Sequence, residues 1–514
     1  MTLFAQPQAW AQGTGFQKLL NDINSSSIPD QQKRQLSCKV RVLEDLGWEF
    51  NQSSQVDHVY NDTSTGVCGN LDIKDSQRLL NINVPSSSTP MKGLSETLDQ
   101  ILQTQNSKCA YKYRLKLATQ AAVKKIYENN NYAFYNPSEE PNCTFQKTQG
   151  WEIISAWGKV NDQINDQRYE IEYPQKKKLN SKQQEVFSDA LRKYSFIVGA
   201  SGSPLEAIRA IEQGSTAVAT DCAIGLQYAL LSAQKELYGD DDFDKAFKKE
   251  EIVVGDQEIL SYGSNPFFGK DRPLIPGTQS CNSIDDEFQR ILCVEQQQSK
   301  YSKEQAAQGP LALIGVDGYI GYTKTTGYRL DDSVNRGQNF VIDDMSNDAA
   351  AALARNGLSY YNDILAEVYQ EHKNIVELVD KNNKEYELFY ETAYDGHDAK
   401  EIRGVLGWAN KKSSLDTIQY PTAERWGTNY ADPNKISILK SFKRIAMLLD
   451  DPFLRQTQVA VHPNHYRFTL AYYALHQVKV NPRATPKIRF YSAAANSTLF
   501  ERFVKFKQDS CMKK

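Results

Sequence analysis

A single cysteine at the start of an apolar helix most constrains what this chain can form. The sequence predicts one short helix before Gly214 and a second helix from Cys222 onward. In the second helix, apolar residues recur at three- and four-residue spacing: Ala223, Leu226, Leu230, Ala233 and Leu237. On position alone, Cys222 is most simply a buried core residue. The alternative is a nucleophile, because free N–H groups and the helix dipole stabilise a thiolate at a helix start.

Residues 203–247 carry a longer pattern around this cysteine: Ser203-Pro204, Glu206-Ala207-Ile208-Arg209, Asp221-Cys222-Ala223, Tyr228 and Phe243-Asp244-Lys245-Ala246-Phe247. This run resembles the catalytic segment of the bacterial spore-coat type protein-glutamine γ-glutamyltransferases, or transglutaminases. That family has an acidic residue, a cysteine and an alanine at the head of a helix. The resemblance implies that Cys222 is the nucleophile. It also implies an α+β fold with a papain-like (NlpC/P60-like) core, in which the cysteine helix packs against an antiparallel sheet.

Two further motifs extend the resemblance. Residues 335–342 are similar to the family's Arg-Gly-Glu-Asn strand, with Gln338 in place of the family's glutamate. An amide can orient a partner through hydrogen bonds but cannot act as a base. Asp221 is a carboxylate beside the cysteine, where the family has a glutamate. A predicted strand over residues 386–392 leads to Gly396-His397, which is similar to the family's catalytic Gly-His pair.

The reaction implied by the resemblance is acyl transfer on protein glutamine side chains. Cys222 would attack the carboxamide and release ammonia, and the thioester would react with a lysine amine or with water. His397 would protonate the ammonia and deprotonate the amine. Groups that could assist it are Asp221, Glu391, Gln338 and Asn339. The partners are then proteins that carry glutamine and lysine, and the scheme requires no cofactor and no metal, calcium included.

Two other functions stay open at this point. The first is a cysteine peptidase or amidase of the same broad fold. The second is a catalytically silent domain that binds proteins, which Gln338 and the large insertions would fit. These alternatives differ in their chemistry, so activity measurements separate them.

The length of 514 residues exceeds what one hydrophobic core usually organises. A proline and a lysine triplet mark one boundary. We expect a mixed, largely helical domain over residues 1–175 and a catalytic domain over residues 180–404. The catalytic domain would contain insertions near residues 278–308 and 346–380, and an α+β extension would follow over residues 405–514.

Local patterns predict individual elements within these regions. Helices are expected over residues 17–23, 30–46, 94–103, 110–127, 346–380, 436–450, 468–477 and 497–507. Within 346–380, Ser346 is expected to cap the helix and Asn356-Gly357 to interrupt it. Strands are expected over residues 311–318, 335–342, 386–392, 459–461 and 487–491.

The composition is that of an ordinary globular protein. A net charge of -3 gives no reason to expect nucleic acid or an anionic membrane as partner. No run approaches the roughly 20 apolar residues of a membrane span, and the first residues lack the pattern of a signal peptide. These features indicate a cytoplasmic location or export without a cleavable signal. They leave the oligomeric state open.

The eight cysteines show no paired zinc-binding spacing. If Cys222 is free, seven remain, an odd number that does not suit a fully bridged framework. Cys281 and Cys293 are close enough in sequence to close a small loop, but we expect reduced thiols in a cytosolic setting.

Three other features are expected to be structural. The acidic residues 239–244 lack the full ligand set of a calcium loop and indicate a hydrated helix end. His462-Pro463-Asn464-His465 indicates a turn with solvated histidines, because no third metal ligand is near in sequence. His372 lies on an apolar stripe and is expected to be a core histidine.

Overall fold

The structure is a computed structural model in which the chain forms two compact units. The first unit comprises residues 1–117, 308–312 and 496–514, and the second comprises residues 118–307 and 313–495. The structure describes residues 14–46, 89–103, 105–128, 132–134, 150–159, 168–171, 194–213, 218–220, 222–255, 275, 277–321, 337–378, 433–460, 467–480, 485–490 and 498–513.

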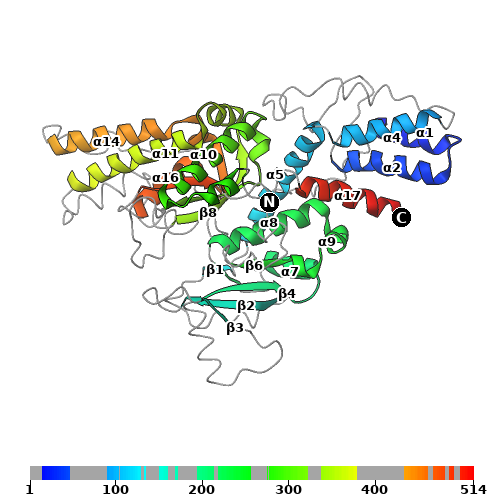
Figure 1. The fold of residues 1–514 in the computed structure, drawn as a ribbon, viewed down its shortest axis with the longest axis horizontal. Coiled ribbons are helices and arrows are strands. Elements are labelled where there is room, and N and C mark those ends of the chain that lie inside the picture. Colours follow the sequence, from blue (N-terminus) through cyan, green and yellow to red (C-terminus); the bar gives the residue numbers. More distant parts are fainter. Residues whose placement is uncertain are drawn as a thin grey trace, which may run out of the picture. The chain divides into compact units, whose positions relative to one another are not determined.

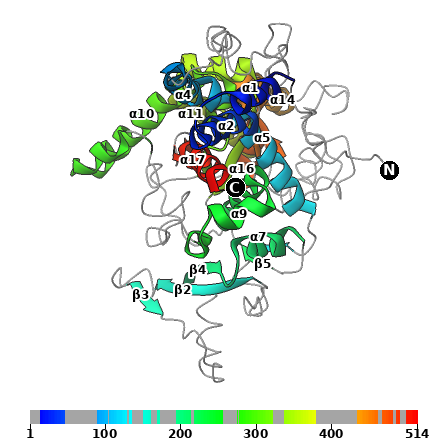
Figure 2. The same cartoon turned by 90° about the vertical axis from the view of Figure 1, so that its right-hand side faces the viewer.

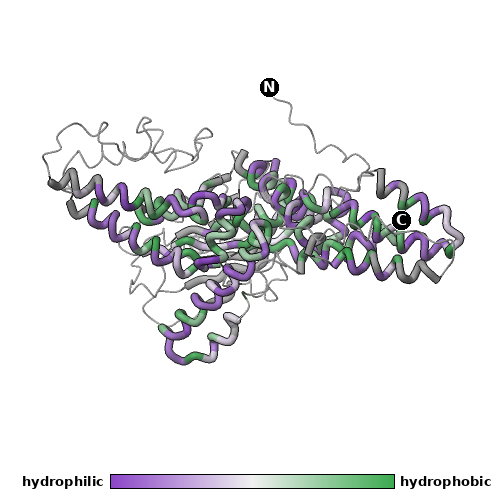
Figure 3. Tube along the Cα trace, turned by 90° about the horizontal axis from the view of Figure 1, so that it is seen from above, coloured by the Kyte–Doolittle hydropathy of each residue, from purple (hydrophilic) through white to green (hydrophobic). Residues whose placement is uncertain are grey.

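The first unit is built from helices (Figure 1). They are α1 (Thr14–Ser25), α2 (Asp30–Asp45), α4 (Thr89–Leu102), the first part of α5 (Gln105–Glu128) and α17 (Thr498–Lys513). Its core contains Tyr111, whose ring lies 5.6 Å from the rings of both Phe500 and Phe503. Hydrophobic residues recur between hydrophilic ones along these helices (Figure 3), which is the pattern of amphipathic helices. The helices predicted in this region are therefore confirmed.

The second unit contains an antiparallel sheet of four strands in the order β3-β2-β4-β6. The strands are β2 (Trp151–Lys159), β3 (Arg168–Ile171), β4 (Tyr194–Ala200) and β6 (Val253–Gly255). Near it lie α7 (Pro204–Glu212), α8 (Cys222–Tyr238) and α9 (Asp240–Ala246) (Figures 1 and 2). Trp151 joins the sheet to these helices, because its Nε1 donates to the Ala207 carbonyl at 2.9 Å and its ring meets that of Tyr228 at 4.9 Å.

A second antiparallel sheet has five strands in the order β10-β9-β8-β7-β11. They are β7 (Asp317–Gly321), β8 (Gly337–Met345), β9 (Thr457–Ala460), β10 (Arg467–Thr469) and β11 (Lys487–Phe490). The register between β8 and β9 shifts between Ile342 and Asp344, which is the pattern of a β-bulge. At this shift the Asp343 carbonyl accepts a hydrogen bond from Gln120. The sheet therefore joins strands from residues 317–345 to strands from residues 457–490.

Helices cover this sheet and one of its edges. Phe340 of β8 contacts the ring of Tyr473 in α16 (Leu470–Val480). Asn362 exchanges two hydrogen bonds with the backbone of Ile488, at 2.8 and 3.3 Å, and so occupies the outer edge of β11. A covered edge strand does not offer its backbone to other chains.

Three long helices lie next to the five-stranded sheet, and the second of them along the chain contacts the other two (Figure 1). They are α10 (Glu287–Ala306), α11 (Asn347–Leu378) and α14 (Pro433–Leu449). The α11 helix begins as predicted, since Ser346 Oγ accepts from the Ala349 amide at 3.0 Å. Gly357 interrupts it with a φ of 73°, which confirms the predicted break. Glu295 ties α10 to β11 through Lys487 and Arg489.

The remaining elements are short. β1 (Tyr132–Phe134) and β5 (Val218–Thr220) pair in parallel. The others are the helix α15 (Pro452–Gln456) and the 3-10 turns η2 (Lys249–Glu251), η4 (Thr278–Ser283) and η5 (Pro310–Leu313).

The fold is α+β, with more helix than sheet and antiparallel pairing in both larger sheets. The strand predicted over residues 311–318 is wrong for its first part. Residues 310–313 form a 3-10 turn, and the strand begins only at Asp317. Gly315 explains the delay, because its φ of 76° is incompatible with a continuous strand.

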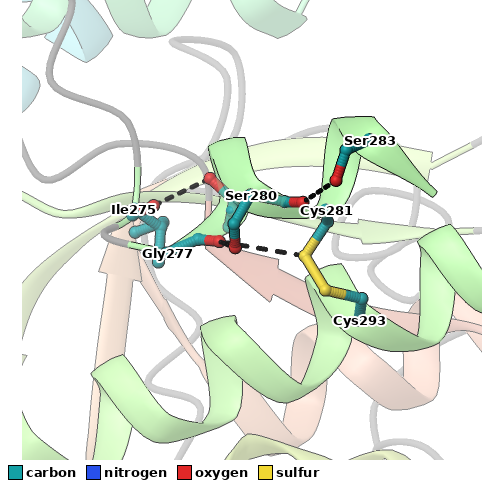
Figure 4. Close-up of a disulfide and its surroundings, with 7 residues drawn as sticks. Ile275, Gly277, Ser280, Cys281, Ser283 and Cys293 are labelled. Carbon is teal, nitrogen blue, oxygen red and sulfur yellow. Dashed lines mark hydrogen bonds between the residues drawn. A yellow bond between two sulfur atoms is a disulfide. The ribbon is translucent and has the colours of Figure 1, made fainter.

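The cysteines correct the expectation of reduced thiols. Cys38 of α2 and Cys511 of α17 form a disulfide within the first unit. Cys281 of η4 and Cys293 of α10 form a disulfide within the second unit (Figure 4). Cys109 is disulfide-bonded as well. The sequence suggested only the short loop between Cys281 and Cys293, because spacing does not reveal a pairing across 473 residues.

Across the described ranges, every helix is too short or too polar to cross a membrane.

Gly318 provides a test of the packing in the five-stranded sheet. A Cβ at this position would overlap the Phe340 ring and lie 2.8 Å from the Arg489 carbonyl oxygen. We expect Gly318→Ala to lower the free energy of unfolding by about 1–3 kcal/mol, the usual cost of overpacking. Urea denaturation measures the difference. Gly202→Ala is the matched control, because its Cβ would meet only the flexible end of Glu206. Equal stability of the two variants would contradict the packing described.

Candidate functional site

The candidate nucleophile Cys222 is the first residue of α8. It follows β5, which ends at Thr220 and pairs in parallel with β1. The chain therefore passes from a strand into the helix within two residues. This placement agrees with the helix start predicted from the sequence. The side chain of Cys222 and all of Asp221 lie outside the described residues.

The α8 helix is buried over most of its length. Every residue from Gly225 to Lys235 is buried. The helix contacts β6 of the four-stranded sheet, β8 of the five-stranded sheet, and α7 and α9. A helix enclosed in this way is fixed by its surroundings on several sides. The position of its first residue is then set by packing, since the buried stretch begins three residues after Cys222.

Three polar side chains of α8, those of Ser232, Lys235 and Glu236, find partners in a largely buried ionic network. Lys235 donates to Glu212 of α7 at 2.5 Å and also contacts Glu236 at 2.8 Å. The side chains of Lys235 and Glu212 are each 7% exposed. Ser232 donates to the same Glu212 carboxylate, and Lys125 of α5 bonds Glu236 at 2.5 Å. The network joins α8 to α7 and to the second half of α5.

Two acidic residues within 239–244, Asp240 and Asp244, hold α9 to α7. Asp240 accepts a hydrogen bond from Arg209 at 2.6 Å. Asp244 accepts from Ser203 Oγ at 2.8 Å and from the Leu205 amide at 2.7 Å. These carboxylates therefore fasten α9 to the start and side of α7. Within the described residues, no cluster of three metal-ligating side chains occurs.

The charges of the network shift the pKa values of Lys235 and Glu236. Burial by itself lowers the pKa of Lys235, but hydrogen bonds to Glu212 and Glu236 outweigh it and raise that pKa. Burial raises the pKa of Glu236, but Lys125 and Lys235 outweigh it and lower that pKa below its ordinary 4.5. Since the folded-state pKa of Glu236 is depressed, its stabilising contribution is present above pH 4.5 and is lost as the pH falls through the folded value.

Strand β8 begins with Gly337, Gln338 and Asn339 of the motif and contacts α8. Gln338 occupies the second position of this strand and pairs with Ile320 of β7, although its side chain lies outside the described residues. Asn339 is buried and 8% exposed. Its neighbour in the strand, Phe340, lies on the opposite face, because side chains alternate along a strand. Phe340 faces Tyr473 of α16. Asn339 therefore presents its amide on the sheet face away from α16.

The structure brings together the elements of two predicted site residues. The helix of Cys222 contacts the strand of Gln338. Glu391 and His397 lie outside the described residues, as does Asp221. His372 is buried, 3% exposed, which confirms its predicted core position.

The residues that position α8 are not evident from the sequence. Glu212 precedes Ser232 by 20 residues, so no local motif links it to Ser232 and Lys235. The available signal was the presence of Ser232 and Lys235, three residues apart, within a helix whose other residues are mostly apolar. A lysine in such a helix requires a buried partner.

Comparison of this chain with protein-family models, with curated proteins and with solved structures gave no match.

The buried pair in α7 and α8 provides a stability test. Lys235→Met leaves the Glu212 carboxylate buried without its cation, so we expect a loss of about 3–5 kcal/mol in urea denaturation at pH 7. The double variant Lys235→Met with Glu212→Gln removes both charges and should recover much of the loss.

Lys245→Met is the matched control for that experiment. Lys245 forms an exposed pair with Asp242 at 3.4 Å, and its loss should cost less than about 1 kcal/mol. A Lys235→Met variant that is no less stable than this control would contradict the network.

Proposed function

We propose that this protein catalyses thiol-dependent acyl transfer on protein glutamine side chains, with Cys222 as nucleophile. The observation that carries the proposal is the start of α8 at Cys222, in a helix packed against the strand that holds the Gln338 motif. First-turn N–H groups and the helix dipole favour a thiolate at this position. A cysteine helix against an antiparallel sheet is also the arrangement that the papain-like resemblance implies.

The chemistry proceeds in two steps. The Cys222 thiolate attacks the γ-carboxamide carbon of a glutamine, and the C–N bond breaks as ammonia leaves with a proton from a histidine. The resulting thioester is then attacked by a lysine amine, which gives its proton to the histidine and releases the thiolate. The product is a γ-glutamyl-lysine isopeptide bond. Water in place of the amine gives glutamate.

The surroundings of α8 supply the rigidity that this chemistry requires. Lys235, Glu212 and the two contacting sheets hold the helix, so the thiolate and the first-turn N–H groups keep a fixed relation. Fixed donors stabilise an oxyanion without reorganisation during the reaction. Asp221 is proposed as the carboxylate that supports the histidine. Gln338 or Asn339 is proposed as its hydrogen-bonding partner from β8.

Amine incorporation tests the proposal. The full chain should attach a fluorescent primary amine to a glutamine-containing protein, and Cys222→Ala should abolish the incorporation while leaving the unfolding curve unchanged. The Lys245→Met variant should retain wild-type incorporation. The rate of Cys222 alkylation against pH should give a thiol pKa below the ordinary value of about 8.5.

Other outcomes would select the alternatives. Cys222-dependent cleavage of peptides without amine incorporation would indicate a cysteine peptidase or amidase. No thiol-dependent turnover of either substrate would leave a protein-binding module. A peptide map that joined Cys222 to Cys109 by a disulfide would also contradict a free nucleophile.

Two histidines are candidates for the proton-transfer partner. His397 is proposed from the Gly-His resemblance. His462 lies outside the described residues, but it follows Ala460 by two residues, and Ala460 pairs with Val341 of β8. Two extended residues span at most about 7 Å, so the covalent chain ties His462 to the strand that carries Asn339.

Alanine substitutions distinguish these histidines. Loss of the partner should lower the rate of amine incorporation by about 10²–10⁴-fold and remove one limb of its pH profile. We expect this result for either His397→Ala or His462→Ala, with Lys245→Met as the control that keeps the wild-type rate. Full activity in both candidate variants would exclude both histidines from the reaction.

A further inference from the structure

Each of the two units contains a disulfide bond. Cys38 and Cys511 join α2 to α17 in the first unit, and Cys281 and Cys293 join η4 to α10 in the second. Together with the bonded Cys109, every cysteine whose side chain is described takes part in a disulfide. Such bonds persist in oxidising surroundings and are rare in the reducing cytosol.

The bond between α2 and α17 is built into a packed core. Cys38 is 3% exposed and lies in a helix whose buried residues include Leu36 and Val40. The two helices contact each other. Lys507 of α17 also lies 3.9 Å from Asp45 of α2. A disulfide in such a setting is a structural element and not an exposed, exchangeable pair.

The second bond fixes a segment that the resemblance treats as an insertion. Cys281 is fully buried in the turn η4, where Thr278 and Ser280 donate to backbone carbonyls at 2.7 Å (Figure 4). Cys293 lies in α10, two residues before Glu295, whose carboxylate bonds Lys487 and Arg489 of β11. The disulfide therefore connects η4, through α10, to the five-stranded sheet.

We infer that this protein matures and works in an oxidising compartment, and that its substrates are proteins exposed there, as secreted and surface proteins are. The part about substrates rests on the acyl transfer proposed above. The part about the compartment rests on the disulfides alone. In this setting Cys222 remains a thiol while the described cysteines are bonded, and the reaction proceeds without added reductant.

The test compares the full chain refolded in a glutathione redox buffer with the same chain treated with dithiothreitol. Alkylation without reduction, followed by peptide mapping, should leave Cys38, Cys109, Cys281, Cys293 and Cys511 unmodified. Reduction should lower the melting temperature by about 5–15 °C, which is the effect expected for loss of structural disulfides. The paired variants Cys38→Ser with Cys511→Ser and Cys281→Ser with Cys293→Ser assign the shift to each bond.

Amine incorporation by the oxidised chain, without reductant, tests the substrate part. It should proceed with a disulfide-containing glutamine protein as acyl donor and should fall when dithiothreitol is added. Activity only in the presence of reductant would overturn the inference.

Alkylation of these five cysteines in the refolded chain, or equal melting temperatures before and after reduction, would also overturn the inference. These readouts do not depend on catalysis. Intact disulfides in a chain that shows no Cys222-dependent incorporation would therefore refute the proposed function and leave the compartment standing.

Discussion

The burial of α8 is the constraint on which the second unit depends. From Gly225 to Lys235 no residue of this helix reaches the surface, so its neighbours must fit it on every side. Apolar residues meet this demand through packing. Lys235 meets it only because Glu212 and Glu236 lie within hydrogen-bonding distance, since an unpaired buried charge would cost several kcal/mol. The ion pair is therefore a consequence of enclosing the helix, and it fixes α7 relative to α8.

The residues that carry the resemblance around Cys222 have structural roles. Ser203 caps α7 by accepting from the Glu206 amide, and its hydroxyl donates to Asp244 of α9. Phe243 and Phe247 are buried, and their rings lie 4.9 Å apart. These contacts hold three helices together behind the cysteine. Packing and capping therefore account for this run of residues, and activity at Cys222 is a separate question for the proposed assays.

Local patterns predicted the helices well because their signals are local. The stripe of apolar residues in α2 and the hydroxyl of Ser346 before α11 act within a few residues of the helix that they define. The sheet was less predictable. Thr457–Ala460 pairs with β8 across more than one hundred residues, and no feature of either segment specifies the other. The same limit applied to Cys38 and Cys511, whose count was visible but whose pairing was not. The same contrast holds within the candidate site. The position of Cys222 follows from the start of its helix, which local patterns predict. Its candidate partners depend on the pairing of the sheet, which local patterns do not predict.

The strand order of the five-stranded sheet indicates which segments lie next to β8 and can supply partners for Cys222. The segments that continue from the neighbouring strands of β8 are one source of groups beside its first residues, and these neighbours are β7 and β9. Gly321, the last residue of β7, pairs with Gly337, and the segment that follows it contains no histidine. The segment that follows β9 contains two, His462 and His465. His397 is nineteen residues beyond the end of α11 at Leu378 and has no such covalent link to β8. Strand order therefore favours the histidine after β9, whereas the resemblance favours His397.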